Sequence, residues 1–128
     1  MNHSRQRELI LEYLKNTKQH PTAEEVFREV RVHEPDISLA TVYRNLKLLA
    51  ENKMISRLNP QNGVDHFDAD TSDHCHLYCR KCNRIFDLEM EMPVAVKKII
   101  KNADSGTGAS IDGLIMYFNG ICEKCKNK

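Results

Sequence analysis

The 128-residue chain lacks any apolar run approaching the roughly 20 residues that a transmembrane helix requires. It also lacks the basic, apolar and small-residue segments of a secretory signal, so we expect a cytoplasmic protein with no membrane partner. Strong net charge is missing as well: the formal charge of +1 neither indicates nor excludes nucleic-acid binding. Any contact with DNA must therefore come from local placement of basic side chains.

Cysteine is present five times, and four of the five form two Cys-x-x-Cys pairs. A thioredoxin-like redox protein usually has one such pair, and disulfides are expected mainly in exported chains. Two pairs are typical of structural zinc, because each tight turn points two thiolates at one ion. We therefore predict a zinc site that ties the C-terminal strand to the middle of the chain and adds folding free energy to a small core. Its ligands are Cys79, Cys82, Cys122 and Cys125.

Hydrophobic periodicity predicts three helices in the N-terminal part of the chain. The first spans residues 5–15. The second begins with a capping box formed by Thr22 and Glu25, and we expect it to end at Pro35 and Asp36. The third spans residues 39–52 and has Ser38 as its N-cap.

One face of the third helix is apolar, and the other face carries side chains suited to DNA. Arginine can reach guanine edges, lysine can neutralise phosphate, and threonine and tyrosine can contact thymine methyl groups or phosphates. An ordinary solvated helix face is the alternative interpretation. The candidate DNA contacts are Ser38, Ala40, Thr41, Tyr43, Arg44 and Lys47.

A hairpin after the third helix favours DNA binding. We predict strands over residues 54–58 and 64–67, joined by a turn over residues 60–63 that contains an Asn-Gly pair. Three helices followed by a hairpin form the winged variant of the helix-turn-helix, in which residues 39–52 are the recognition helix. We assign residues 1–69 to this winged-helix domain.

Residues 70–128 predict a small α/β dimerisation domain, so the fold class is α+β. We expect a strand over residues 83–88, a helix that starts at Pro93, a flexible loop over residues 104–108 and a frayed C-terminal tail. A strand over residues 109–118 is apolar on both faces from Leu114 onward, which predicts burial on both sides and a second copy of the chain. The apolar stripe of the helix is Val96, Ile99, Ile100 and Ala103.

A second group of metal-binding residue types surrounds the first Cys-x-x-Cys pair. His74 and His76 are two residues apart, so on a strand both imidazoles point to one face and form half of a metal site. A solvated histidine pair is an equally good interpretation. Asp68 and Asp87 lie on flanking strand-like segments and could be further ligands or surface carboxylates, and His20 by itself indicates nothing.

Four sequence segments together resemble the ferric uptake regulator family, from about Ser4 to Cys125. They are HPTAEEV from His20, SLATVYRNL from Ser38, FDxxxSDHCHLYCxxC from Phe67 and GICxxC from Gly120. The resemblance implies a dimeric, metal-responsive winged-helix repressor that is not an enzyme and binds inverted-repeat double-stranded DNA. It also implies an Fe(II) or Mn(II) site whose ligands are His20, Asp68, His74, His76 and Asp87.

Position 87 suggests a branch of this family. Iron-sensing members typically have Glu there, whereas peroxide-sensing members resemble this chain in having Asp87. The resemblance then implies that hydrogen peroxide reacts at the iron and oxidises His20 or His74, so that metal and DNA are released. A regulator of iron or zinc uptake that reports metal level alone is the alternative, and a small metalloenzyme is a third.

The sequence departs from the family pattern at three places. The chain begins close to its first winged-helix segment, so we expect the family's additional N-terminal helix to be missing or very short. No histidine follows His76, so an accessory metal site that uses a later histidine is not expected. Cys75, between the two predicted ligand histidines, is either a small buried residue or an oxidisable thiol near the iron.

Overall fold

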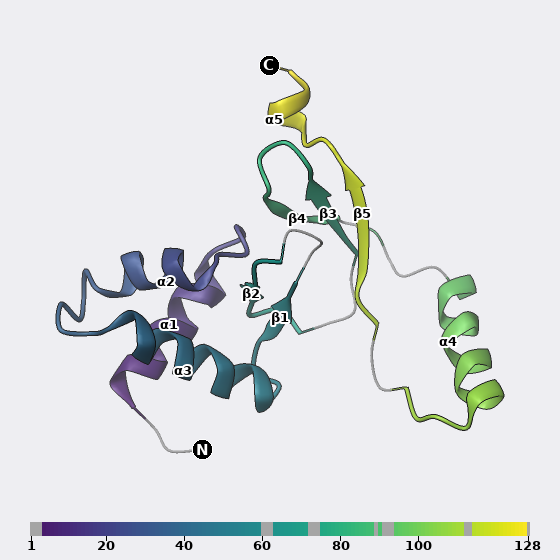
Figure 1. The fold of residues 1–128 in the computed structure, drawn as a ribbon, viewed down its shortest axis with the longest axis horizontal. Coiled ribbons are helices and arrows are strands. Elements are labelled where there is room, and N and C mark those ends of the chain that lie inside the picture. Colours follow the sequence, from purple (N-terminus) through teal and green to yellow (C-terminus); the bar gives the residue numbers. More distant parts are fainter. Residues whose placement is uncertain are drawn as a thin grey trace.

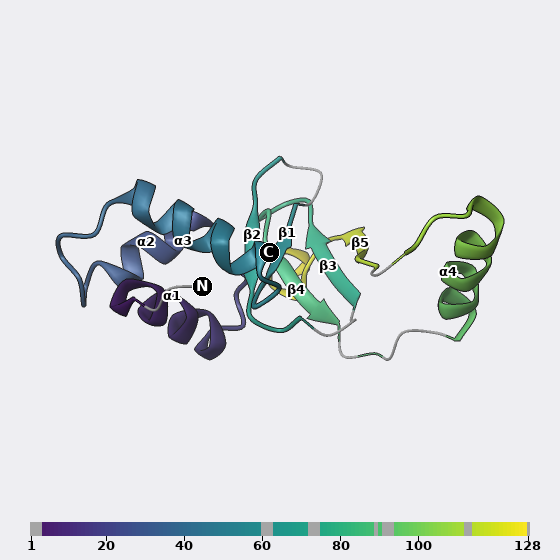
Figure 2. The same ribbon diagram turned by 90° about the horizontal axis from the view of Figure 1, so that it is seen from below.

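The computed structural model describes residues 4–59, 63–71, 75–88, 90, 94–111 and 114–127. Helices α1 to α3 and strands β1 and β2 form an N-terminal unit, and strands β3 to β5 with helices α4 and α5 form a C-terminal unit. Figures 1 and 2 show α1–α3 at one end of the molecule, α4 at the other and the two sheets between them. Within the described residues, no helix combines the length and apolar character needed to span a membrane.

The three predicted N-terminal helices are confirmed. Helix α1 spans Arg5–Asn16, α2 spans Ala23–Val30 and α3 spans Leu39–Glu51. The predicted capping box is present: the Thr22 hydroxyl accepts from the Glu25 N–H, and the Glu25 carboxylate accepts from the Thr22 N–H. The predicted end of α2 was wrong. The helix stops at Val30, and the following residues form turns that bring Ile37 into the core.

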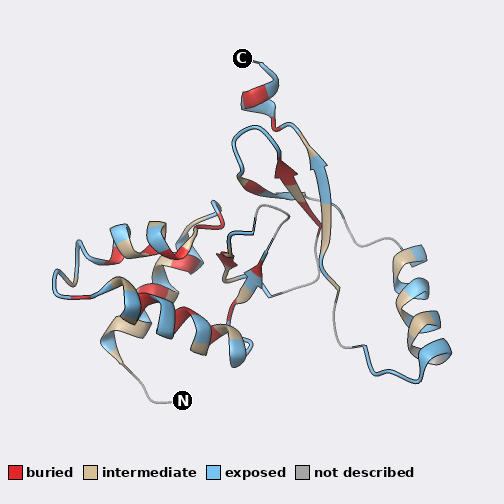
Figure 3. Cartoon of the chain, viewed as in Figure 1, coloured by how far each residue is buried: buried red, intermediate tan, exposed pale blue. Residues whose placement is uncertain are grey.

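The inner faces of α1–α3 enclose the largest apolar core of the described residues, and Figure 3 shows the buried residues of these helices in red. This core holds apolar side chains of all three helices and joins them to Ile55, which precedes β1, and to Phe67 of β2. Burial of these faces fixes the three helices relative to one another. The packing therefore holds α3 rigidly, with its outer face toward solvent. The buried members are Ile10, Leu14, Ala23, Val26, Val30, Ile37, Val42, Leu46, Leu49, Ile55 and Phe67.

The predicted hairpin is present but its strands are shorter than expected. Strand β1 spans Ser56–Leu58 and β2 spans His66–Asp68, and they pair antiparallel. The Met54 N–H bonds to the carbonyl of Leu49 at the end of α3, so the chain is not free to enter a ladder there. Residues 60–62 of the predicted turn lie outside the described residues, as does Pro93 before α4.

The C-terminal unit is built on a three-stranded sheet in the order β4-β3-β5. Strand β3, Cys75–Cys79, pairs antiparallel with β4, Ile85–Leu88, and parallel with β5, Met116–Gly120. Strand β4 starts two residues later than predicted because Asn83 has a left-handed backbone, with φ of 61°. Strand β4 and helix α4 lie in the chain between β3 and its parallel neighbour β5, so the connection of this parallel pair is long.

Two predictions for residues 104–127 were wrong. Helix α4 spans Val94–Thr107 and so includes most of the predicted loop; it ends before Gly108, whose φ of 71° suits a helix C-terminus. The predicted frayed tail contains a short helix, α5, over Glu123–Lys126. A turn of helix between Cys122 and Cys125 brings both sulfurs to the same side.

The last strand starts later than predicted, and in a single chain it is not buried on both sides. Strand β5 begins at Met116, not at residue 109, and Ile115 and Phe118 are 50% and 44% exposed. In helix α4, Val94 and Ile99 are 68% and 64% exposed. These apolar side chains therefore lie on the surface of a single chain, and their burial by a second copy stays a prediction.

Candidate metal centres

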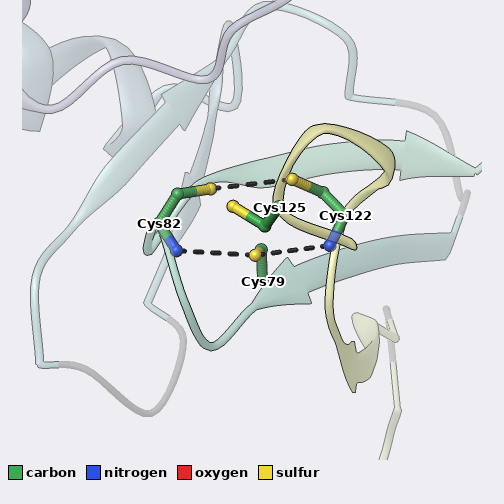
Figure 4. Close-up of side chains that lie close together, drawn as sticks. All are labelled: Cys79, Cys82, Cys122 and Cys125. Atoms are coloured by element: carbon green, nitrogen blue, oxygen red, sulfur yellow. Dashed lines mark hydrogen bonds between the residues drawn. The ribbon is translucent and has the colours of Figure 1, made fainter. Parts of the chain in front are cut away.

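The four paired cysteines come together at one end of the three-stranded sheet (Figure 4). Cys79 ends β3, Cys82 lies in the turn toward β4, and Cys122 and Cys125 belong to the start and body of α5. All four sulfurs lie within 4.8 Å of one another, and the Cys82 and Cys122 sulfurs are 3.9 Å apart. Four thiolates about 2.3 Å from one zinc ion stand about 3.8 Å apart, so this geometry fits a closed tetrahedral site. All five cysteines of the chain are free.

The protonation of these thiols differs across the cluster. The backbone N–H groups of Cys122 and Cys82 donate to the Cys79 sulfur and lower the pKa of that thiol to about 6. Burial raises the pKa of Cys125 to about 12 and raises the pKa of Cys82 above its usual value. A divalent cation fits here because it replaces the protons that burial otherwise retains.

Zinc binding should therefore depend steeply on pH. At pH 7 the metal-free protein keeps protons on Cys82 and Cys125, and binding must release both. We expect the apparent zinc affinity to rise at least about 100-fold between pH 7 and pH 8, because these two released protons alone contribute about tenfold each. Competition with a chromophoric chelator at several pH values measures this slope, and a pH-independent affinity would contradict the predicted protonation of the two thiols.

A second cluster lies between the two units. His20 comes from the loop before α2, Asp68 ends β2, His76 lies on β3, and Asp87 lies directly opposite His76 on β4. One donor atom from each of these residues lies within 4.8 Å of the other three. The structure thus brings together four of the five residues that the resemblance implied. His74 lies outside the described residues.

Distances within this cluster converge on the Nε2 atom of His20. It lies 2.8 Å from Asp87 Oδ1 and 3.1 Å from Asp68 Oδ2. The Nε2 atom of His76 lies 3.5 Å from Asp87 Oδ1 and 4.0 Å from Asp68 Oδ2. His20 Nδ1 lies 3.0 Å from the Lys18 carbonyl oxygen, so Nδ1 carries the hydrogen in the neutral ring and Nε2 is free to face a cation.

Strand β2 holds the loop that carries His20. The Phe67 N–H donates to the Pro21 carbonyl at 2.9 Å, and Thr22 forms a β-bridge with His66. The His66 Nδ1 atom lies 2.9 Å from the His20 carbonyl oxygen and donates a hydrogen bond to it. These contacts fix His20 in a left-handed backbone conformation, with φ of 50°. The role of buried His66 was not predicted, because its partner is a backbone atom 46 residues away.

Charges within the cluster favour a bound cation. Burial lowers the pKa of His20, but the hydrogen bond and charge of Asp68, with those of Asp87, outweigh it and raise the pKa. Burial also disfavours the charged form of Asp68 and so raises its pKa. Hydrogen bonds from His20, His76 and the Asp70 N–H outweigh this and leave the pKa of Asp68 well below its usual range. A proton on His20 thus balances the two carboxylates in the metal-free protein, and a divalent ion would take over that task.

The donor set of this cluster is mixed nitrogen and oxygen, unlike the thiolates of the first. Imidazole and carboxylate ligands suit Fe(II) and Mn(II), and such sites keep positions open for chemistry. The site borders a cleft of about 580 Å³ lined by both carboxylates, by Lys15 and Lys18 of the N-terminal unit, and by Phe86 and Met90. The Asp87 side chain is 39% exposed, so small solutes can reach the site from this cleft.

Most of the predicted DNA contacts lie on the outer face of α3. Ser38, Ala40, Tyr43, Arg44 and Lys47 are exposed, and Thr41 is half-buried. The Arg44 Nη2 atom donates to the Thr41 hydroxyl oxygen at 3.0 Å, and the Ser38 hydroxyl donates to the same oxygen at 2.9 Å. Hydrogen bonds therefore connect three of the six candidate contacts, Ser38, Thr41 and Arg44.

Cys75 does not join either cluster. It is fully buried, and its sulfur lies 3.8 Å from the Met116 sulfur on the neighbouring strand β5. This environment agrees with the interpretation of Cys75 as a small buried residue.

Comparison with known proteins agrees with the fold. A sequence profile described as the ferric uptake regulator family matches residues 1–117. The peroxide operon regulator of Bacillus subtilis is 32% identical over 123 residues, covering 96% of this chain and 83% of that protein. The peroxide-responsive repressor PerR of Staphylococcus aureus is 30% identical over 123 residues, covering 96% and 81%. The solved structure of the Campylobacter jejuni peroxide stress regulator is 30% identical, with a TM-score of 0.77 and coverage of 94% of this chain and 88% of that one.

The winged-helix unit, the sheet that carries four thiolates and the matching profile define the class: metal-dependent, DNA-binding transcriptional regulators. The chain belongs to the ferric uptake regulator family. The resemblance identified from the sequence is confirmed, as is the α+β fold class. Membership makes the chain a regulator of transcription and not an enzyme.

Proposed function

We propose that this regulator is a repressor that senses hydrogen peroxide through Fe(II) held by His20, Asp68, His74, His76 and Asp87, with Mn(II) as an alternative occupant. The observation that carries the proposal is the cluster of four of these side chains around one point between the two units. Similarity to the peroxide operon regulator and to PerR supports the peroxide branch, as does aspartate at position 87. The four clustered cysteines hold a structural zinc ion.

Metal binding would couple the sensor to DNA through the positions of its ligands. His20 and Asp68 belong to the N-terminal unit, whereas His76 and Asp87 belong to β3 and β4 of the C-terminal unit. A cation that binds all of them holds residues 1–69, as the DNA-binding domain, in one arrangement against residues 70–128. Loss of the cation removes that restraint, so the orientation of α3 is no longer fixed relative to a partner subunit.

Peroxide would act on a ligand histidine. Fe(II) held by the proposed ligands would supply the redox chemistry that activates peroxide. One oxygen atom of peroxide would enter a C–H bond of the imidazole of His20 or His74, and the other would leave as water, so that peroxide itself is the two-electron oxidant. The modified ring is a poorer ligand, so the cluster loses affinity for the metal and the repressor releases DNA.

Repression requires a dimer on an inverted-repeat operator in the cytoplasm. The exposed side chains of Ile115 and Phe118 on and beside β5 and of Val94 and Ile99 on α4 supply an apolar surface that a second copy of the chain would cover. Two copies present two α3 helices, and the polar face from Ser38 to Lys47 contacts successive major grooves.

The alternative is a regulator that reports iron or zinc level without reacting with peroxide. Replacing Asp87 by Glu separates the two functions. We expect Asp87→Glu to keep metal-dependent DNA binding, because a carboxylate remains, but to slow peroxide inactivation at least about tenfold, because the longer side chain alters the open side of the site.

Release of a labelled operator after peroxide addition to Fe(II)-loaded protein measures this rate. Asp70→Glu is the matched control, since Asp70 lines the same cleft but is not one of the four clustered residues. Equal peroxide sensitivity in Asp87→Glu and the unmodified protein would remove Asp87 as the selector between the two functions.

A further inference from the structure

A bidentate ion pair joins the two units. Each of its residues lies a few positions along the chain from a member of the second cluster (His20, Asp68, His76 and Asp87), hereafter the His/Asp cluster. Arg84 Nη1 donates to Glu25 Oε1 at 3.0 Å, and Arg84 Nη2 donates to Glu25 Oε2 at 2.6 Å. Glu25 lies in the first turn of α2, and Arg84 lies immediately before β4. Two parallel N–H···O bonds fix both distance and orientation, which a single contact between flexible side chains does not. Both side chains are shielded in part, with 23% of Glu25 and 37% of Arg84 exposed.

The zinc-binding turn fixes the position of Arg84. The Cys79 N–H donates to the Arg84 carbonyl at 3.0 Å, and the Asn83 N–H donates to the Cys79 carbonyl at 2.9 Å. The Tyr78 hydroxyl donates to Asn83 Oδ1 at 2.6 Å. Arg84 is thus held only two residues after Cys82, in a turn that a bound zinc ion would close.

The start of α2 fixes the position of Glu25. Its Oε1 atom accepts from the Thr22 N–H at 3.1 Å and from the guanidinium of Arg84, so one carboxylate oxygen serves both the capping box and the ion pair. Burial raises the pKa of Glu25, but the hydrogen bonds from Arg84 and Thr22 outweigh it and lower the pKa below its usual value. The carboxylate is therefore ionised and already oriented before any metal binds.

The same two segments carry two of the clustered ligands. His20 lies five residues before Glu25, and Asp87 lies three residues after Arg84. We propose that Glu25 and Arg84 are positioning residues for the metal site: they hold the segment 20–25 against β4, so that His20 already faces Asp87 when the metal arrives. This inference rests on the proposed metal-binding function of the cluster. It also makes the zinc-binding turn part of the sensor, because that turn presents Arg84.

The size of the effect follows from preorganisation. Apparent affinity falls in proportion to the fraction of molecules in the binding-competent arrangement. If removal of the ion pair reduces that fraction to about one tenth, the apparent Mn(II) affinity falls about tenfold although every ligand is retained.

The experiment uses full-length, zinc-loaded protein and titrates Mn(II) as the probe. Arg84→Met keeps the length and apolar stem of the side chain, and Glu25→Gln keeps a capping-box residue while removing the charge. Arg5→Met is the matched control, because Arg5 pairs with Glu34 within the N-terminal unit. We expect about tenfold weaker Mn(II) binding in each of the first two variants, no further loss in the double variant, and unchanged binding in the control. Zinc content stays at one ion per chain in all four variants.

A second readout needs no metal in the His/Asp cluster. Residual dipolar couplings of the Mn(II)-free protein report whether both units share one alignment. We expect the two units to be aligned more alike in the unmodified protein, where the ion pair favours the binding-competent arrangement, than in Arg84→Met. Unchanged Mn(II) affinity and unchanged alignment in Arg84→Met, with normal Mn(II) binding by the unmodified protein, would overturn the positioning role. Failure of the unmodified protein to bind Mn(II) would instead overturn the proposed function and, with it, the role of the pair in metal binding.

Discussion

Replacing Cys122 by Ser is expected to abolish stable zinc binding and to unfold most of the C-terminal unit. Structural zinc contributes about 10–16 kcal/mol to the folding of small domains, which equals or exceeds the roughly 5–15 kcal/mol of net stability of a typical domain. The apolar cluster that the C-terminal unit forms with the end of β1 is small: its buried members are Leu58, Tyr78 and Ile85. Hydroxyl oxygen is a poor substitute for thiolate toward zinc, so three remaining sulfurs will not hold the ion tightly.

The N-terminal unit has its own larger core and should survive this change. Zinc content and amide hydrogen exchange, followed residue by residue, test the prediction: protection should be lost in β3 and β5 and kept in α1–α3. Cys75→Ala is the matched control, because Cys75 is as buried as Cys79 but stands outside the cluster. One zinc ion per chain and native exchange rates in Cys122→Ser would show that the cluster is not needed for the fold.

Replacing His20 by Asn is expected to weaken Mn(II) binding at least about 100-fold and to abolish metal-dependent DNA binding. Loss of a group that only orients a ligand already costs about 10- to 100-fold in metal affinity, and loss of the ligand itself should cost more. Asn is chosen because it tolerates the left-handed backbone at this position, whereas alanine would add strain. His20 is also the ligand from the loop directly before α2, so its loss breaks the link between metal and helix-turn-helix.

Isothermal titration with Mn(II) and operator binding by fluorescence anisotropy measure the two effects. Zinc content should not change, because the cysteine cluster lies at the other end of β3 from the His/Asp cluster. His33→Asn is the matched control, since His33 is exposed in the same unit. Full metal-dependent DNA binding by His20→Asn would contradict the assignment of His20 as the coupling ligand.

Local patterns predicted the parts of the structure that local physics decides. The capping box at Thr22 and the apolar stripes of α1–α3 needed only side-chain spacing, and the Cys-x-x-Cys pairs predicted their own association. The sequence pattern around His20 did not by itself predict a role for this residue. Its approach to Asp87, 67 residues away, depends on how β2 positions one loop and β3 positions β4. Only the resemblance to the family linked these residues before the structure did.

The features that sequence alone did not give have a common physical origin. The apolar residues on both faces near β5 predicted burial by a second copy of the chain, but composition does not distinguish packing within one chain from packing between two, and Ile115 and Phe118 are exposed in the single chain. The ion pair between Glu25 and Arg84, 59 residues apart, and the bond from His66 to the His20 carbonyl leave no periodic signal in the sequence. Pairings of this kind are set by tertiary structure and become visible only in it.

The central claim is that this regulator reacts with peroxide at the cluster that contains His20, Asp68, His76 and Asp87. Mass spectrometry of Fe(II)-loaded protein after brief peroxide exposure tests it most directly, with Mn(II)-loaded protein as the comparison. We expect the gain of one oxygen atom on His20 or His74 in the Fe(II) form and none in the Mn(II) form. Oxidation confined to cysteines, with both histidines unmodified, would contradict the claim.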